Sequence, residues 1–140
     1  MPRRHAKLTD EDFAGLLELR DGLRRFLHWS EDQARAVGVT GTQHQLLLAV
    51  RGHGAPPSIG EIAEHLLLRH HSVVELVDRA ERAGLVERFD DDVDQRVVRV
   101  RVTTEGEAKL TALAAAHLEE LSRLRSSFTS LFEQRQEERS

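Results

Sequence analysis

The stretch SIGEIAEHLLLRHHSVVELVDRAERAGLVERFDDDVDQRVVRVRV, from Ser58 to Val102, decides the fold. Ser58 is followed three residues later by Glu61, which is the pattern of a capping box and predicts that a helix starts there. A second helical pattern runs from about residue 70 to residue 83, with apolar residues three and four positions apart. Gly84 follows it, at a position that favours a left-handed residue. The stretch therefore begins with two short helices joined by a connection of four or five residues.

The end of the same stretch changes to the period of a β-strand. Val98, Val100 and Val102 alternate with polar residues, which predicts a half-buried strand. Residues 85–89 favour a short strand, and the acidic residues 90–94 between the two predict a turn. Two short helices followed by a β-hairpin form the winged type of helix-turn-helix, in which the second helix lies in the major groove of DNA.

Helical patterns extend on both sides of this stretch. Residues 9–36 form a long amphipathic pattern, and Thr42 is predicted to cap a short helix over residues 43–51. A last helix, capped by Thr103 or Thr104, is expected to run to about residue 134, with a heptad-like apolar seam suited to a partner helix. The seam consists of Leu110, Leu113, His117, Leu121, Leu124, Phe128 and Leu131. We therefore expect a mainly α fold with a small β-hairpin wing, of the α+β class.

Composition limits the possible function classes. The 140 residues fit one domain, and the absence of cysteine excludes disulfides and thiolate zinc sites. No apolar run is long enough to span a membrane, and no apolar segment follows the basic residues 1–5, so we expect a cytoplasmic protein without a secretory signal. The net charge of −4 argues mildly against nucleic-acid binding, although the local placement of charge matters more than the total.

Four motifs, in order along the chain, carry a resemblance to a known family. They are GTQHQLLL at residues 41–48, ELVDRAERAGLVER at residues 75–88, DQR at residues 94–96 and VTTEG at residues 102–106. This set resembles the multiple antibiotic resistance regulator (MarR) family, over roughly Leu23 to Leu124. The resemblance implies one domain over residues 1–140, with dimerisation helices at 9–36 and 104–134 and a winged helix-turn-helix at 42–103.

The resemblance also implies a function. Members of this family are homodimers whose two recognition helices address a pseudo-palindromic site in double-stranded DNA. They commonly repress transcription and are released by a small, often aromatic and anionic effector. By this analogy Arg96 enters the minor groove while Asp94 holds it in place, and no cofactor is implied.

The candidate DNA contacts lie on the outward face and at the start of the second helix, at the start of the first, and on the wing. They are Ser58, His70, His71, Ser72, Val74, Glu75, Arg79, Asp94 and Arg96. The competing interpretation is that the histidines, Glu75 and Arg96 are ordinary solvated side chains and that Ser58 is only a helix cap.

Two features depart from the family pattern. Glu75 stands where many members carry a basic residue; it can accept a hydrogen bond from cytosine N4 but repels phosphate. Residues 69–101 also sum to −1, with seven arginines against eight acids.

A ligand site is a second hypothesis. Trp29, with Arg25 nearby to pair a carboxylate, suggests a pocket for an aromatic acid, to which His28 and His44 are added as candidates. The alternative interpretation is packing in the core or at the dimer interface. We expect no metal site, because the eight histidines include no His-x₃-His pair.

Two other function classes compete with the regulator. One is a winged-helix protein–protein adaptor with little DNA affinity, which the acidic balance would suit. The other is an enzyme, which we do not expect because the chain has no Gly-rich phosphate loop, nucleophile elbow or metal-binding motif, and so no catalytic residue is proposed.

Overall fold

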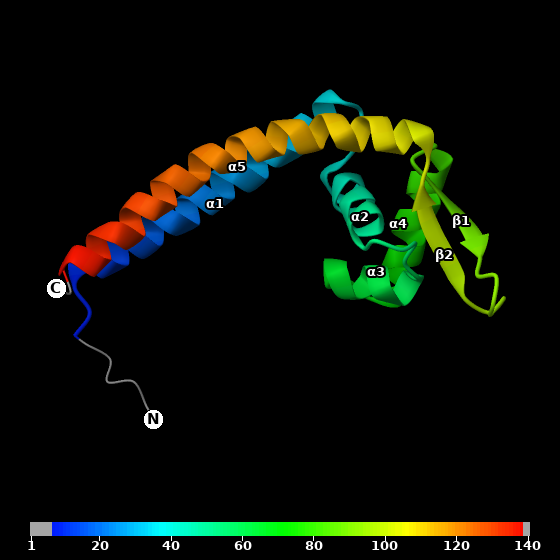
Figure 1. Cartoon of the computed structure of the whole chain (residues 1–140), viewed down its shortest axis with the longest axis horizontal. Helices are drawn as coiled ribbons and strands as arrows, with labels where there is room; N and C mark the ends of the chain where they lie inside the picture. The colour runs from blue at the N-terminus through cyan, green and yellow to red at the C-terminus, as the bar shows by residue number, and fades with distance from the viewer. Residues whose placement is uncertain (1–6, 139–140) are drawn as a thin grey trace. The chain divides into compact units, whose positions relative to one another are not determined.

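The computed structural model describes residues 7–138, without the side chains of residues 127, 130, 131, 134, 135, 137 and 138. The basic residues 1–5 and the side chain of Leu131, the last residue of the expected seam, therefore lie outside the described part. The elements are α1 (Asp10–Ala36), α2 (Gly41–Gly52), α3 (Ile59–Leu66), α4 (His70–Arg82), β1 (Val86–Asp90), β2 (Val98–Val102) and α5 (Thr104–Glu138). Helices dominate and one hairpin is present, as the sequence predicts (Figure 1).

The chain divides into two compact units. Glu31–Ala115 form one, which we call the winged-helix unit, and Met1–Ser30 with Ala116–Ser140 form the other, which we call the helical-pair unit. The long helices α1 and α5 each contribute one part to each unit.

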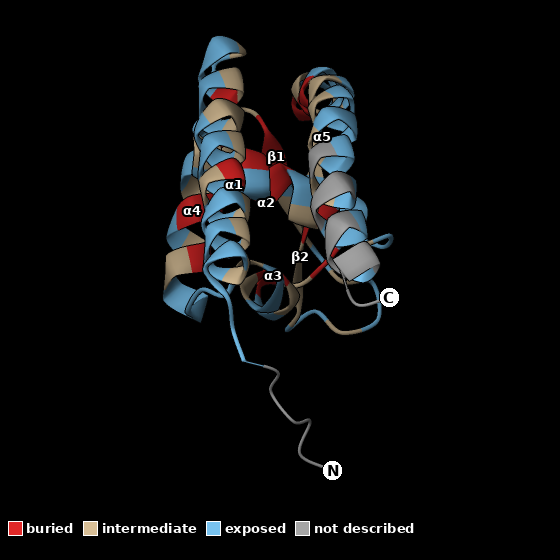
Figure 2. Cartoon of the chain, turned by 90° about the vertical axis from the view of Figure 1, so that its left-hand side faces the viewer, coloured by how far each residue is buried: buried red, intermediate tan, exposed pale blue. Residues whose placement is uncertain are grey.

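The winged-helix unit contains the buried core. α2, α3 and α4 pack together, with α2 and α3 also against β2 and α4 against β1. The buried parts of these elements are red in Figure 2, and they carry most of the fully buried side chains. Removing one such side chain from water contributes about 1.5–3 kcal/mol. They are Leu46, Leu47, Ile62, Val73, Val77, Leu85, Val86, Val100 and Leu113. This core fixes how α3, α4 and the hairpin are presented.

The helix-turn-helix begins at the predicted cap, but the connection between its helices is shorter than the predicted four or five residues: α3 ends at Leu66 and α4 begins at His70, which leaves three residues. The Ser58 hydroxyl accepts a hydrogen bond from the Glu61 amide (3.2 Å), and the Glu61 carboxylate accepts one from the Ser58 amide (3.1 Å). Leu67 adopts a left-handed conformation (φ 55°) and ends α3. Gly84 does so after α4 (φ 76°), where a side chain would be strained.

The hairpin is antiparallel and is attached to the start of α3. Val86 pairs with Val102, and Asp90 pairs with Val98. The Val100 amide donates to the Pro57 carbonyl (3.0 Å), so β2 also contacts the segment that leads into α3. β1 begins one residue later than predicted, because the Leu85 amide instead donates to the Ala80 carbonyl of α4 (2.9 Å).

The predicted cap of the second helix is wrong by two residues. Thr40, not Thr42, caps α2: its hydroxyl accepts from the Gln43 amide (3.1 Å), and the Gln43 side chain accepts from the Thr40 amide (3.0 Å). Thr42 is followed by a glutamine at the same spacing, so the pattern alone does not separate the two. The earlier start adds the hydrogen bond from the His44 amide to the Thr40 carbonyl (3.0 Å).

The last helix begins at one of its two candidate caps and is longer than predicted. Thr103 is the cap: its hydroxyl accepts from the Gly106 amide (3.1 Å) and donates to the Gly84 carbonyl (2.6 Å). This links the start of α5 to the end of α4. The helix extends to Glu138 rather than to residue 134.

In the helical-pair unit, α1 and α5 meet through side chains. The Ser30 hydroxyl and the His117 Nε2 atom are 2.6 Å apart, and the Trp29 and His117 rings lie 4.8 Å apart. The apolar residues of α1 recur at helical spacing, yet most are 41–60% exposed. These are Phe13, Leu16, Leu17, Leu23 and Leu27. Periodicity identifies an apolar face but not what covers it.

None of the helices in residues 7–138 combines the length and the apolar character that a membrane crossing requires.

Candidate nucleic-acid interface

Helix α4 presents a polar face away from the core. His71, Glu75 and Arg79, spaced four residues apart, are exposed on it. Ser72 and Val74 are half-buried beside them. These residues keep the positions expected of them, and the buried side of the helix carries Val73, Leu76, Val77 and Ala80.

Asp78 of α4 is bonded to the hairpin. Its carboxylate accepts a hydrogen bond from Arg88 of β1 (2.6 Å). The same guanidinium donates to the Val74 carbonyl (3.2 Å) and to Glu81 (3.1 Å). Arg88 therefore binds α4 to the hairpin, a role that its place in the GLVER motif did not reveal.

The wing carries an arginine that is held by a neighbouring carboxylate. Arg96 Nε donates to Asp94 Oδ1 (3.0 Å) and Nη2 donates to Oδ2 (3.2 Å), while the Arg96 amide donates to Oδ1 (3.1 Å). The hydrogen bonds from the Arg96 side chain and then from its amide hold the pKa of Asp94 below its usual value. The Arg96 side chain is nevertheless 91% exposed, so its cation projects into solvent.

A groove brings several candidate residues together. It has a volume of about 450 Å³ and lies where the starts of α3 and α4 face the wing. Its lining includes Ser58, His70, Val74 and Arg96. The free amides at a helix start attract anions, and two such starts open here beside an exposed guanidinium. The arrangement suits a phosphate group.

Ion pairs hold most of the acids within residues 69–101, together with four of the seven arginines. Five of the eight acids within residues 69–101 are bonded to arginines of the hairpin. The pairs are Asp78 and Glu81 with Arg88, Glu87 with Arg101, Asp91 with Arg99, and Asp94 with Arg96. Arg69 and Arg79 make no ion pair with any residue that the structure describes. Outside the ion pairs, Arg69, Arg79 and Arg82 balance Glu75, Asp90 and Asp92, so the net charge of −1 lies within the paired groups.

The Asp91 carboxylate stabilises the tip of the hairpin through hydrogen bonds. Its carboxylate accepts hydrogen bonds from the amides of Val93 (3.2 Å) and Asp94 (2.9 Å) and from Arg99 Nε (2.7 Å). Arg99 also donates to the Pro56 carbonyl (3.0 Å), which connects the wing to the segment before α3. The sequence predicted only an acidic turn here, because nothing in the run of aspartates distinguishes Asp91.

Asp91 should make the stability of the wing sensitive to acid. The hydrogen bond from Arg99, followed by that from the Asp94 amide, lowers the pKa of Asp91 from its ordinary value of 3.8. The ionised form therefore stabilises the fold above pH 3.8, and this contribution is lost as the pH falls through the lower folded value. Asp91→Asn should be less stable at neutral pH and should lose less stability on acidification.

Urea unfolding of wild type and variant between neutral and acidic pH measures this effect. Asp92→Asn is the matched control, because Asp92 is exposed and has no bonded partner among the described residues. Stability curves for Asp91→Asn that run parallel to wild type at all pH values would contradict the assignment.

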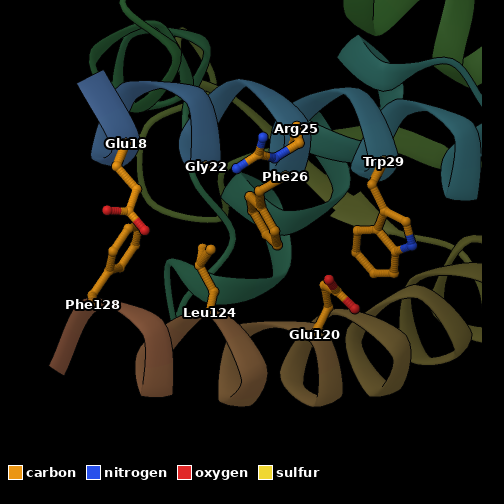
Figure 3. Close-up of a pocket in the computed structure, with 8 residues that line it drawn as sticks. All are labelled: Glu18, Gly22, Arg25, Phe26, Trp29, Glu120, Leu124 and Phe128. Carbon is orange, nitrogen blue, oxygen red and sulfur yellow. The ribbon is translucent and has the colours of Figure 1, made fainter. Parts of the chain in front are cut away.

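The four candidate ligand residues are divided between the two units. Arg25 and Trp29 line a pocket of the helical-pair unit (Figure 3), whereas His28 is exposed and does not line it. His44 is buried in α2 and belongs to the winged-helix unit.

Within residues 7–138, no three histidine or acidic side chains are grouped to hold a metal ion. The His53 ring instead bridges His65 (2.9 Å) and Glu61 (2.8 Å).

Two short helices, a hairpin bonded to both of them and an exposed wing arginine define the class of this molecule: it is a winged helix-turn-helix protein. A family model described as the MarR family matches residues 37–97, which include α2, α3, α4 and β1. Over these residues, just under half of its length, the chain is similar to the MarR family.

Two known transcriptional regulators are similar in sequence to about half of this chain. It is 35% identical over 72 residues to the uncharacterized HTH-type transcriptional regulator YsmB of Bacillus subtilis, covering 51% of this chain and 49% of that protein. It is 32% identical over 78 residues to the HTH-type transcriptional repressor MdtR of Bacillus subtilis, covering 56% and 50%. The matches thus span about half the length of these relatives.

Among solved structures, a MepR mutant from S. aureus bound to an oligodeoxyribonucleotide superposes with a TM-score of 0.66 and 21% identity, covering 86% of this chain and 84% of that one. At this identity the likeness concerns the fold.

Proposed function

We propose that this protein is a sequence-specific DNA-binding transcriptional regulator that acts in the cytoplasm as a homodimer. The observation that carries the proposal is the exposed Arg96, held by Asp94 beside a groove at two helix starts. The similar fold of MepR, whose mutant was solved bound to an oligodeoxyribonucleotide, supports it.

Each part of the interface has a distinct role. Helix α4 lies in the major groove with His71, Glu75 and Arg79 toward the base edges. Glu75 accepts a hydrogen bond from cytosine N4, so it selects for a cytosine rather than adding affinity. Ser58, His70 and Ser72 lie at helix starts and contact phosphates, which fix the register of α4 on the duplex. Arg96 enters the adjacent minor groove, where negative potential attracts arginine.

A homodimer would cover the apolar face of the helical-pair unit. Phe13, Leu16, Leu17 and Leu27 are each more than half exposed on α1, and Leu118 is 70% exposed on α5. Exposed apolar surface of this extent is typical of an interface. Two copies related by a twofold axis would present two α4 helices to a pseudo-palindromic operator.

Sedimentation of the full chain tests the dimer directly. We expect a dimer at micromolar concentration, and a stable monomer at that concentration would contradict the proposal.

Repression relieved by a small ligand is the regulatory mode that we propose. The name of MdtR as a transcriptional repressor supports repression. Binding of the full chain to a fragment from upstream of its own coding sequence tests the whole function. We expect a complex that weakens steeply with added salt, since phosphate contacts release counterions.

The same experiment separates the regulator from its competitor. Failure to bind any such fragment at low salt would favour a winged-helix protein–protein adaptor, which the net charge of −4 would suit.

A further inference from the structure

A pocket in the helical-pair unit has a mixed aromatic and acidic lining. Its volume is about 330 Å³, which falls within the size range of small-molecule sites. Residues of α1 and α5 line it from opposite sides (Figure 3). They are Glu18, Gly22, Arg25, Phe26, Trp29, Glu120, Leu124 and Phe128.

The lining carries more negative than positive charge. Two carboxylates, Glu18 and Glu120, face one guanidinium, Arg25, which gives a sum of −1. Glu18 has no ion-pair partner among the described residues, and Glu120 has only Arg123 at 3.4 Å, which is not part of the lining. In Figure 3 both carboxylates project between the helices, whereas the Arg25 side chain lies along α1.

The apolar part of the lining is aromatic. Phe26 and Trp29 have ring centroids 5.9 Å apart with an angle of 30° between the planes, and Phe128 lies opposite on α5. All three rings are half-buried, so they present ring surface to the pocket without being sealed in the core. The faces of aromatic rings carry negative potential and attract cations.

We propose that this pocket binds a small organic cation that carries an aromatic ring. The rings would stack on the ligand, while Glu18 and Glu120 would flank its positive centre. An aromatic acid, which Trp29 and Arg25 suggested from the sequence, would place its carboxylate against two like charges. This cation would be the small ligand that relieves repression, so the proposal rests on the proposed function.

Trp29 provides the measurement, because it is the only tryptophan of the chain. The full-length protein, without DNA, is titrated with benzyltrimethylammonium, with its neutral isostere neopentylbenzene and with the anion phenylacetate. We expect the cation to quench Trp29 fluorescence saturably and to bind at least about tenfold more tightly than the other two.

Glu18→Gln and Glu120→Gln remove one charge each while keeping the side-chain shape. Each should weaken binding of the cation by about fivefold to tenfold and leave neopentylbenzene unaffected. Glu119→Gln is the matched control: it neutralises the adjacent residue of α5, which is exposed and does not line the pocket. Because Glu119 and Glu120 share Arg123, a second control is Glu133→Gln, at an exposed residue of α5 that does not line the pocket and has no ion pair among the described residues. Glu133→Gln should leave all three affinities unchanged.

Three results would overturn the proposal: tighter binding of phenylacetate, no quenching by any probe, or an unchanged preference in both pocket variants. Because DNA is absent from these titrations, their failure leaves the proposed DNA binding intact. Loss of DNA binding in the separate experiment would likewise leave the pocket result standing.

Discussion

Arg96→Ala is expected to weaken DNA binding by the full chain by about tenfold to a hundredfold, which corresponds to roughly 1.4–2.7 kcal/mol. The guanidinium is 91% exposed and lies at the wing, where Asp94 already fixes its orientation through two side-chain hydrogen bonds. Little side-chain entropy is therefore lost when it enters a groove. Removing it deletes the contact and, within the fold, only the two side-chain hydrogen bonds to Asp94.

Fluorescence anisotropy at several salt concentrations measures the loss. If Arg96 also contacts phosphate, the slope of log affinity against log salt should fall by about one. Asp94→Ala keeps the Arg96 guanidinium but removes the carboxylate that fixes its orientation. We therefore expect a smaller loss of DNA affinity than in Arg96→Ala.

Arg101→Ala is the matched control on the same hairpin. It removes the same charge from a side chain that is bonded to Glu87 and lies over the Phe89 ring, 4.6 Å from its centroid. Its effect on affinity should be several-fold smaller. Wild-type affinity in Arg96→Ala, or equal losses in the two variants, would refute a specific role for the wing arginine.

Gly106→Ala should destabilise the chain by about 3 kcal/mol or more, and we expect it to fold poorly. Gly106 is buried in the first turn of α5, and a Cβ atom there would lie 2.2 Å from the Leu85 carbonyl oxygen and 2.9 Å from Val102 Cγ1. A backbone atom cannot move aside as a flexible side chain can. The clash would separate α5 from the segment after α4 and disturb the Thr103 cap.

The direction of the stability change distinguishes the clash at Gly106 from the usual effect of alanine in a helix. Alanine in place of glycine within a helix normally stabilises by about 0.5–1 kcal/mol. Gly60→Ala in α3 is the control, because its Cβ atom would meet only the Ser58 hydroxyl at 3.9 Å. Urea unfolding should show Gly60→Ala near or above wild type and Gly106→Ala far below it. Equal stability of the two variants would contradict the packing described.

Local chemistry made much of the fold predictable from sequence. The Ser58–Glu61 capping box, the glycine after α4 and the alternating valines of β2 each act through neighbours a few residues away. The outward face of α4 follows from the period of its apolar residues. The Asp94–Arg96 pair was expected from the family resemblance, and the two side chains are close enough in sequence to meet.

The features that could not be predicted depend on distant parts of the chain. Arg88 reaches back across ten residues to Asp78, and Arg99 reaches Pro56 across 43. Glu18 and Glu120 line one pocket only after α1 and α5 pair. The sequence therefore did not show the acidic lining, and the ligand was predicted to be an acid from Arg25 alone. Thr40 and Thr42 are each followed by a glutamine three residues later, so both match the capping pattern. Only the folded helix shows which of the two is the cap.

Selection of bound DNA from a random library tests sequence-specific binding by a homodimer, because it measures binding, symmetry and half-site spacing in one experiment. We predict enrichment of a pseudo-palindrome whose half-sites are about one helical turn, roughly 10 base pairs, apart. A cytosine at the position that faces Glu75 should recur in both halves. Recovery of no enriched sequence at low salt, or of a single site without symmetry, would contradict the account.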